Sequence, residues 1–169
     1  MTSALRGAAA ALLLLASGEA AELPGRKTPP LAATDLRGRR VELSQYRGRV
    51  VLVHFWATWC GPCREELPSL ARLGHRLGHR HFEVLSVDLG EGPKRVGDFL
   101  RALSIDLPVL LDRDQRIAEA WGVTGLPTTF LVDARGRIRL SVFGASDWSG
   151  GAAVEAVERL LAEAETTAL

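Results

Sequence analysis

The sequence predicts a single α/β domain with a mixed central sheet flanked by helices. The evidence is an almost unbroken β-branched and aromatic run at residues 50–56, apolar residues at helical spacing after it, and a second apolar run at 82–88. A strand, a helix and a strand in this order form a βαβ unit with parallel strands. The 169 residues, 47% of them apolar, are sufficient for one core without cross-links.

The first twenty residues are expected to lie outside this domain. Arg6 precedes an apolar run at residues 8–16, and small residues around Ala20 follow it, which is typical of a secretory signal peptide. The run is well short of the ~20 apolar residues that span a bilayer. We therefore expect cleavage after Ala20 and export to the periplasm or the extracytoplasmic face. An uncleaved membrane anchor is the alternative.

Residues 21–30 carry proline and glycine among polar residues and are interpreted as a tether, so the domain is expected to span residues 31–165. An N-terminal β-hairpin opens the domain, and a second hairpin lies near its end. The apolar residues of the second helix, Leu103 among them, are expected to face the core. The expected elements are strands 34–36, 40–43 and 50–56, a helix from 62 to 77, strand 82–88, helix 94–104, strand 108–111, helix 117–121, strands 128–132 and 138–143, and helix 152–162.

The chemistry is predicted at the only two cysteines, in Trp59-Cys60-Gly61-Pro62-Cys63. Two thiols at this spacing can form a disulfide, and the N-terminus of the following helix should lower the pKa of the Cys60 thiol. Cys60 is then the nucleophile, and Cys63 resolves the mixed disulfide that Cys60 forms. A structural disulfide would remove little loop entropy over four residues, and a zinc site would need two further ligands.

The segment from Val51 to Pro68 resembles the active-site segment of the TlpA/ResA-like exported thioredoxins. Residues 122–133 resemble the second signature of that family, and the helix and strand between Glu91 and Leu111 resemble its central insertion. The resemblance implies a thioredoxin fold and thiol:disulfide oxidoreductase activity. The redox-active disulfide is the implied reactive group, so no cofactor and no metal are expected.

The resemblance also implies roles for individual residues. A cis peptide bond is implied before Pro127, with the backbone of Leu126 pairing with an extended substrate; a trans-proline that opens an edge strand is the alternative. Glu66, one helical turn after Cys63, is implied to tune the cysteine pair and to help move protons. It would otherwise only complement the helix dipole.

Three further residues complete the expected substrate surface, and one histidine departs from the family pattern. Trp59, Gly61 and Pro62 are expected to contact the substrate, although Trp59 could instead pack in a half-buried position. His54 occupies a position where thioredoxins carry an acid and this family more often carries asparagine. It either modulates the proton of Cys63 or is simply a hydrogen-bonded core residue.

The dipeptide between the cysteines and the family resemblance predict the direction of electron flow and the partners. Gly61-Pro62 is the thioredoxin dipeptide, which is typical of a reductant. The implied substrates are protein disulfides such as those of apocytochrome c or of oxidase copper-site cysteines. The implied electron donor is a DsbD- or CcdA-like membrane thiol carrier. A monomer is expected.

Other functions are weighed against this one. The 21 lysines and arginines balance 20 acidic residues without long runs of like charge, which argues against a nucleic-acid partner. A peroxiredoxin-like peroxidase would carry threonine where Ala57 stands. A copper-binding chaperone of the Sco type would use a wider cysteine spacing and a ligating histidine. These two classes remain the alternatives to a thiol:disulfide reductant.

Overall fold

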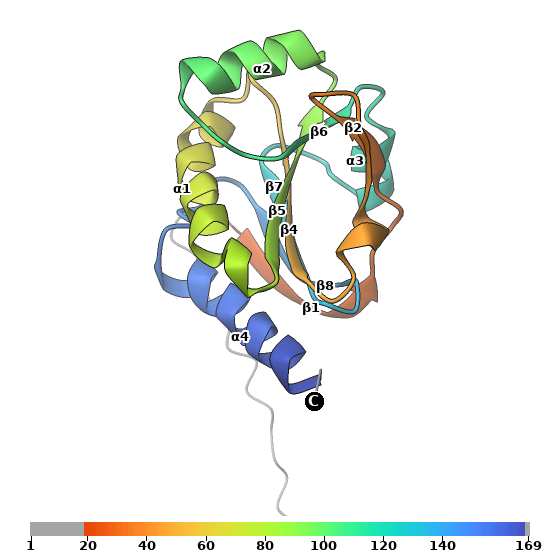
Figure 1. Ribbon diagram of the computed structural model, residues 1–169, viewed down its shortest axis with the longest axis vertical. Coiled ribbons are helices and arrows are strands. Elements are labelled where there is room, and N and C mark those ends of the chain that lie inside the picture. Colours follow the sequence, from red (N-terminus) through yellow and green to blue (C-terminus); the bar gives the residue numbers. More distant parts are fainter. Residues whose placement is uncertain (1–18, 168–169) are drawn as a thin grey trace, which may run out of the picture.

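A computed structural model describes residues 19–167 of the chain (Figure 1). The expected signal peptide therefore lies outside the described residues, except for its last two positions. Among the described residues, no helix combines the length and the apolar character needed to cross a bilayer.

The sheet is mixed and has eight strands in the order β1-β8-β7-β4-β5-β6-β2-β3. β4 runs parallel to β5 and β5 parallel to β6, whereas the remaining pairs are antiparallel. The mixed central sheet predicted from the sequence is confirmed. The strands are β1 (Glu19–Lys27), β2 (Ala32–Asp35), β3 (Arg40–Glu42), β4 (Val50–Trp56), β5 (Phe82–Leu89), β6 (Val109–Asp112), β7 (Thr128–Val132) and β8 (Arg137–Phe143).

Helices cover both faces of the sheet, with α1 and α4 on one face and α3 on the other (Figure 1). The core is accordingly divided into two clusters. One contains Leu52, Leu67 and Val157 between the sheet and α1 and α4, and the other contains Phe55 and Trp121 on the α3 side. The helices are α1 (Gly61–Leu77), α2 (Pro93–Ala102), α3 (Arg116–Trp121) and α4 (Gly151–Thr167), and the short 3-10 helices are η1 (Leu43–Tyr46) and η2 (Gly78–Arg80).

Strand β4 lies near the middle of the sheet, between β5 and β7, and every one of its residues is buried. Its β-branched and aromatic residues suit a strand that is covered on both faces. Because side chains alternate along a strand, His54 and Trp56 share the face of Leu52, which packs toward α1. The cysteine motif follows this strand directly, so the most buried part of the sheet positions the motif.

The tether expected at residues 21–30 is wrong over most of its length, because β1 extends to Lys27 and pairs with β8. This pairing uses backbone groups, so the polar composition gave no sign of it. The register shifts between Glu22 and Arg26, around Gly25 with its positive φ of 78°. A glycine adopts that conformation without strain, which allows the strand to continue past the irregularity.

Two expected helix ends are also corrected. α2 ends at Ala102, so Leu103 lies beyond the helix with 42% of its surface exposed and does not face the core. α4 continues to Thr167, five residues past its expected end at 162. Its added turns carry acidic residues, and Glu163 pairs with Arg139 of β8 at 2.7 Å. This ion pair accompanies the extension, which the apolar pattern alone did not indicate.

Candidate active site

The two cysteines lie where β4 gives way to α1. β4 ends at Trp56, the chain turns over the next three residues, and Cys60 is the N-cap of α1. Pro62 occupies the first turn of the helix, where its missing N–H costs no hydrogen bond. The local sequence thus ends the strand and starts the helix within a few residues of the motif.

Cys60 and Cys63 form a disulfide with an S–S distance of 2.02 Å. The backbone N–H of Cys63 donates a hydrogen bond to the Sγ atom of Cys60 at 3.3 Å. Cys60 retains 6% of its exposure, whereas Cys63 is fully buried. Once the bond is reduced, the Cys60 sulfur is therefore the one that has an N–H donor, the positive end of the helix dipole and access to solvent.

We expect iodoacetamide to alkylate Cys60 of the reduced protein at least about ten-fold faster than Cys63 at neutral pH, because the thiolate is the reactive species. Mass spectrometry of peptides after timed quenching measures both rates in one sample. Labelling of the unfolded protein in denaturant is the control, since the two thiols should then react at similar rates. Equal rates in the folded protein would contradict the assignment of Cys60 as the nucleophile.

Glu66 lies on the same buried face of α1 as Cys63, one turn further along, and is only 2% exposed. The indole N–H of Trp148 donates to its Oε1 atom at 2.6 Å, and the backbone N–H of Ser146 donates to its Oε2 atom at 3.3 Å. Burial raises the pKa of Glu66 to about 7, although these bonds favour the carboxylate. The carboxyl can therefore gain or lose a proton near neutral pH.

His54 is fully buried beside Glu66. Its Nδ1 atom lies 3.0 Å from the hydroxyl of Thr129 and 3.5 Å from Oε1 of Glu66. Burial lowers the pKa of His54 to about 3, so the imidazole is neutral at physiological pH. Its Nε2 atom has no hydrogen-bond partner among the described residues. The structure thus brings two residues singled out from the sequence into one buried polar cluster.

A second cluster holds the chain just before the cysteines. The backbone N–H and the hydroxyl of Thr58 donate to the two carboxylate oxygens of Glu91, each at 2.7 Å. Arg95 of α2 donates to the Thr58 hydroxyl at 3.1 Å and also to Glu91. Burial alone would raise the pKa of Glu91, but its hydrogen bonds with Thr58, Asp88 and Arg95 together outweigh burial, and the pKa lies below its ordinary value. Glu91 is therefore ionised, and it holds in place the segment that leads to Cys60.

Asp88, at the carboxyl end of β5, is buried near this second cluster. Burial, followed by the neighbouring Glu91, raises the pKa of Asp88 to about 8. Asp88 is therefore a neutral acid beside an ionised one. Sequence reasoning missed both residues, although two carboxyls at the carboxyl end of a buried strand beside the motif are a usable signal.

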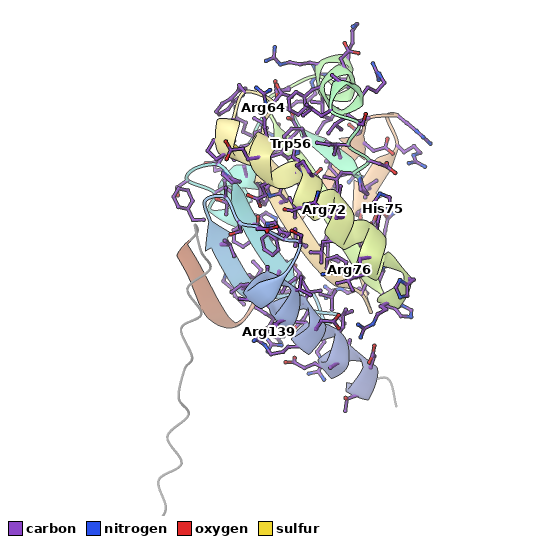
Figure 2. The ribbon with its side chains drawn as sticks, turned by 90° about the vertical axis from the view of Figure 1, so that its left-hand side faces the viewer. Trp56, Arg64, Arg72, His75, Arg76 and Arg139 are labelled. Atoms are coloured by element: carbon purple, nitrogen blue, oxygen red, sulfur yellow. A yellow bond between two sulfur atoms is a disulfide. The ribbon has the colours of Figure 1, made fainter. Side chains whose placement is uncertain are left out.

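Helix α2 also contacts the start of α1 through an aromatic ring. The ring centroid of Phe99 lies 5.7 Å from that of Trp56 and 5.5 Å from the guanidinium carbon of Arg64. Figure 2 shows Trp56 and Arg64 at the N-terminal end of α1, beside α2. The arrangement supports the segment of the cysteines from the side of the inserted helix.

The peptide bond between Leu126 and Pro127 is cis, as the family resemblance implies. The hydroxyl of Thr128 donates to the carbonyl of Gly125 at 2.7 Å, and the N–H of Gly144 donates to the carbonyl of Pro127 at 2.9 Å. Phe55 of β4 is in register with Thr128, so the loop lies beside the chain that leads to Cys60. Trp59 on that chain is 66% exposed.

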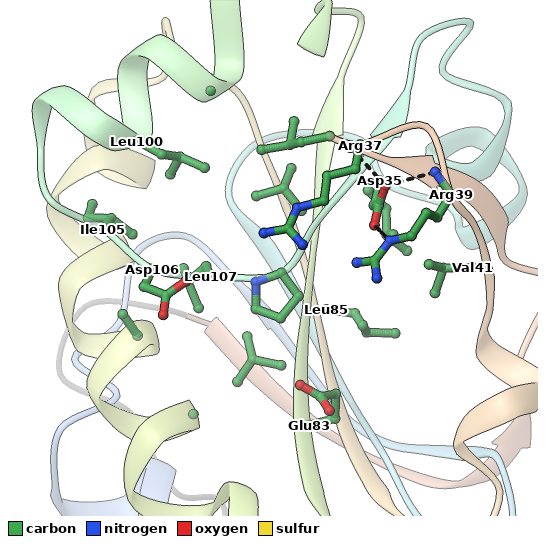
Figure 3. Close-up of a pocket in the computed structure, with 18 of the residues that line it drawn as sticks. Asp35, Arg37, Arg39, Val41, Glu83, Leu85, Leu100, Ile105, Asp106 and Leu107 are labelled. Carbon is green, nitrogen blue, oxygen red and sulfur yellow. Dashed lines mark hydrogen bonds and ion pairs between the residues drawn. The ribbon is translucent and has the colours of Figure 1, made fainter. Parts of the chain in front are cut away.

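A pocket elsewhere in the molecule is separate from this site. It has a volume of about 680 Å³ and opens between the β2–β3 hairpin, α1 and the segment before β6 (Figure 3). Its charged lining includes Arg37, Arg39, Glu83 and Asp106. Neither cysteine lines it, and neither do the two buried polar clusters. The reactive groups of the chain therefore lie at the end of β4 and not in this pocket.

Comparisons with known proteins agree with this geometry. The sequence model of the AhpC/TSA family matches residues 24–141. The thiol-disulfide oxidoreductase ResA of Bacillus subtilis (strain 168) is 35% identical over 120 residues, which are 71% of this chain and 67% of that protein. ResA of Geobacillus thermodenitrificans (strain NG80-2) is 36% identical over 120 residues, which are 71% of this chain and 69% of that protein.

Solved structures show the same fold. A protein described as thiol:disulfide interchange protein DsbE from Chlorobium tepidum is similar with a TM-score of 0.71 and 31% identity, over 85% of this chain and 99% of that one. The thioredoxin domain of a thiol-disulfide oxidoreductase from Bacteroides vulgatus has a TM-score of 0.72 at 24% identity, over 83% and 99% of the two chains. The chain belongs to the AhpC/TSA family and is a ResA-like thiol-disulfide oxidoreductase of thioredoxin fold, with the Cys60–Cys63 pair as its CxxC motif.

Proposed function

We propose that the protein is exported and acts as a reductant of protein disulfides on the extracytoplasmic face. The observation that carries the proposal is the asymmetry of the cysteine pair. Cys60 caps the helix and its sulfur accepts a hydrogen bond from a backbone N–H, whereas Cys63 is fully buried. An attacking sulfur needs thiolate character and access, and a resolving sulfur needs proximity. The two cysteines meet these separate requirements.

The reaction proceeds in two thiol–disulfide exchanges. The Cys60 thiolate attacks one sulfur of the substrate disulfide, forms a mixed disulfide and displaces the other substrate sulfur as a thiolate. Cys63 then loses its proton and attacks the Cys60 sulfur, which releases the second substrate thiolate. Two electrons pass to the substrate, its two thiolates take up two protons, and the Cys60–Cys63 disulfide remains.

The oxidised protein then needs a source of electrons. A DsbD- or CcdA-like membrane thiol carrier would supply them by the reverse exchange, restoring both thiols. The substrates we propose are the haem-attachment cysteines of apocytochrome c or the copper-site cysteines of an oxidase. The similarity to ResA and to a DsbE-type protein supports disulfides in proteins as the substrate class. The protein itself is proposed to work as a monomer.

The substrate is proposed to dock between the exposed face of Trp59, with Gly61 and Pro62 behind it, and the loop of the cis-proline. Among the described residues, neither the N–H nor the C=O of Leu126 takes part in a backbone hydrogen bond of a turn, loop or cap. An extended substrate segment could satisfy both groups, as in the addition of a strand to a sheet edge. Pro127 would shape this contact.

Glu66 is proposed to exchange protons with the thiols as they react, with His54 as its modulator. The carboxyl lies one turn from Cys63 and has a pKa of about 7, which suits a group that must both accept and return a proton. The neutral imidazole of His54, 3.5 Å from Oε1 of Glu66, adjusts how readily that carboxyl ionises.

The redox potential tests the direction of electron flow. We expect equilibration with glutathione to give a potential closer to the value of thioredoxin, about −270 mV, than to that of DsbA, about −120 mV. Quantifying the reduced fraction by thiol alkylation across a series of redox buffers gives the potential. A value above about −150 mV would make the protein an oxidant and contradict the proposed direction.

The two alternative functions receive no support from the site. Ala57 is buried in the position where a peroxidase would need threonine, and no group of three or more potential metal-ligating side chains occurs among the described residues. Consumption of hydrogen peroxide without an added dithiol would instead support a peroxidase. Stoichiometric copper binding would support a copper-binding chaperone.

A further inference from the structure

Exposed aromatic surface gathers around the redox site. Three large apolar side chains of the described residues are exposed: Trp59 at 66%, Phe143 at 50% and Leu103 at 42%. Trp59 directly precedes Cys60, and Phe143 ends the strand that pairs with β7 beside the cis-proline loop. Leu103 lies elsewhere, just beyond the end of α2. Trp59 therefore adjoins Cys60, and Phe143 adjoins the cis-proline loop.

Phe143 is in register with Thr128, the residue that follows Pro127. Its ring lies over the backbone of Gly125, because a Cβ atom on that glycine would be only 2.7 Å from Cε2 and 3.0 Å from Cζ of the ring. The glycine thus permits a contact between ring and loop backbone that a larger residue would obstruct. One face of the loop is covered by an aromatic ring that remains half exposed.

The loop under this ring is held firmly on either side of Leu126. The carbonyl of Gly125 accepts the hydroxyl of Thr128, and the carbonyl of Pro127 accepts the N–H of Gly144. The side chain of Leu126 packs against both core clusters, which leaves its backbone as the part available to a partner. The ring of Phe143 and the backbone of Leu126 therefore form one surface that is ordered before a substrate binds.

We propose that Phe143 determines substrate specificity, by favouring protein disulfides in which a bulky apolar residue flanks the attacked cysteine. The inference rests on the proposed reductase function and deepens it. An extended segment that pairs with Leu126 runs past the ring of Phe143, and an apolar side chain of that segment removes the exposed half of the ring from water. A small polar side chain leaves the ring hydrated and gains nothing from it.

Phe143 is well suited to this role because it carries little of the folding core. Among the described residues, it is absent from both buried clusters and from the aromatic ring pairs. An exposed aromatic that is not needed for packing is available to a partner, and aromatic residues are over-represented among the side chains that dominate protein interfaces.

Two disulfide-bonded peptides test the proposal. Both contain the same small Cys-x-x-Cys ring, and the residues next to each cysteine on the outer side are leucine in one peptide and serine in the other. We expect the reduced protein to reduce the leucine peptide at least about five-fold faster, measured as the second-order rate constant of a single turnover. In Phe143→Ala the two rates should agree within about two-fold, while Phe143→Leu should retain part of the preference.

Control measurements separate docking from chemistry and folding. The rate with oxidised glutathione, which has no extended apolar segment, should change less than about two-fold in either variant. Leu103→Ala removes a similarly exposed side chain away from the loop and should keep the full preference. A preference that survives in Phe143→Ala, or equal rates for both peptides in the unmodified protein, would overturn the inference. Failure to reduce either peptide would instead contradict the proposed reductase function.

Discussion

Cys60→Ser is expected to abolish the reduction of protein disulfides, with a loss on the order of 10³-fold or more, because the remaining thiol, Cys63, is fully buried and cannot make the first attack. Cys63→Ser should behave differently. Cys60 keeps its helix N-cap position in that variant and still attacks, but the mixed disulfide cannot be resolved. The protein should therefore accumulate covalently bound to its substrate.

The two serine variants are matched controls for each other, because both lack the Cys60–Cys63 bond. A change in stability from the loss of the disulfide affects them equally, so a difference in trapping reports the order of attack. Non-reducing gel electrophoresis followed by mass spectrometry identifies the trapped partner. Trapping by Cys60→Ser instead of Cys63→Ser would reverse the assignment of nucleophile and resolving thiol.

His54→Asn and Glu66→Gln are expected to give opposite pH dependences of stability. Burial raises the pKa of Glu66 from 4.5 to about 7, so its contribution to stability is full below pH 4.5 and is lost as the pH rises through about 7. Burial lowers the pKa of His54 from 6.5 to about 3, so its contribution is full above pH 6.5 and is lost as the pH falls toward 3.

The two contributions oppose each other between pH 4.5 and pH 6.5. His54→Asn removes one of them, so the free energy of unfolding should fall with pH in this window, by at most about 1.4 kcal/mol per pH unit relative to the wild type. Glu66→Gln should make it rise by a similar slope. Urea unfolding followed by the fluorescence of the four tryptophans gives these free energies at each pH.

The difference between each variant and the wild type isolates one group, because the other titrating groups are common to both proteins. Parallel curves for the wild type and both variants would contradict the buried, neutral state of the pair. An ionised pair of His54 and Glu66 would instead make each single variant lose stability, since the partner left behind would be buried and unpaired.

The sequence predicted the elements that depend on local patterns and missed those that depend on backbone pairing. The buried strand Val50–Trp56 was predicted with its observed bounds, because an unbroken β-branched and aromatic run is a strong local signal. β1 was missed, since its polar residues and its glycine and proline resemble a linker while its backbone pairs with a strand more than a hundred residues away.

The same distinction holds for the site. The cysteine pair, Glu66 and the cis-proline could be predicted from the sequence because each lies in a short motif that resembles a known family. The hydrogen-bond donors of Glu66 could not be predicted, because Ser146 and Trp148 lie about eighty residues further along the chain and contact Glu66 only in the folded molecule. The contact of Phe143 with Gly125 likewise depends on the register of β7 and β8.

Under the proposed export, cleavage after Ala20 and folding would compete for the same stretch of backbone. Ala20, after which cleavage is expected, is in register with Val142 of β8, and Ala21 is in register with Ser141. A peptidase needs this stretch extended and free, but the finished domain already uses it in the sheet. Under the proposed export, cleavage after Ala20 would therefore have to precede the pairing of β1 with β8. A chain that completes its sheet first would retain the leader.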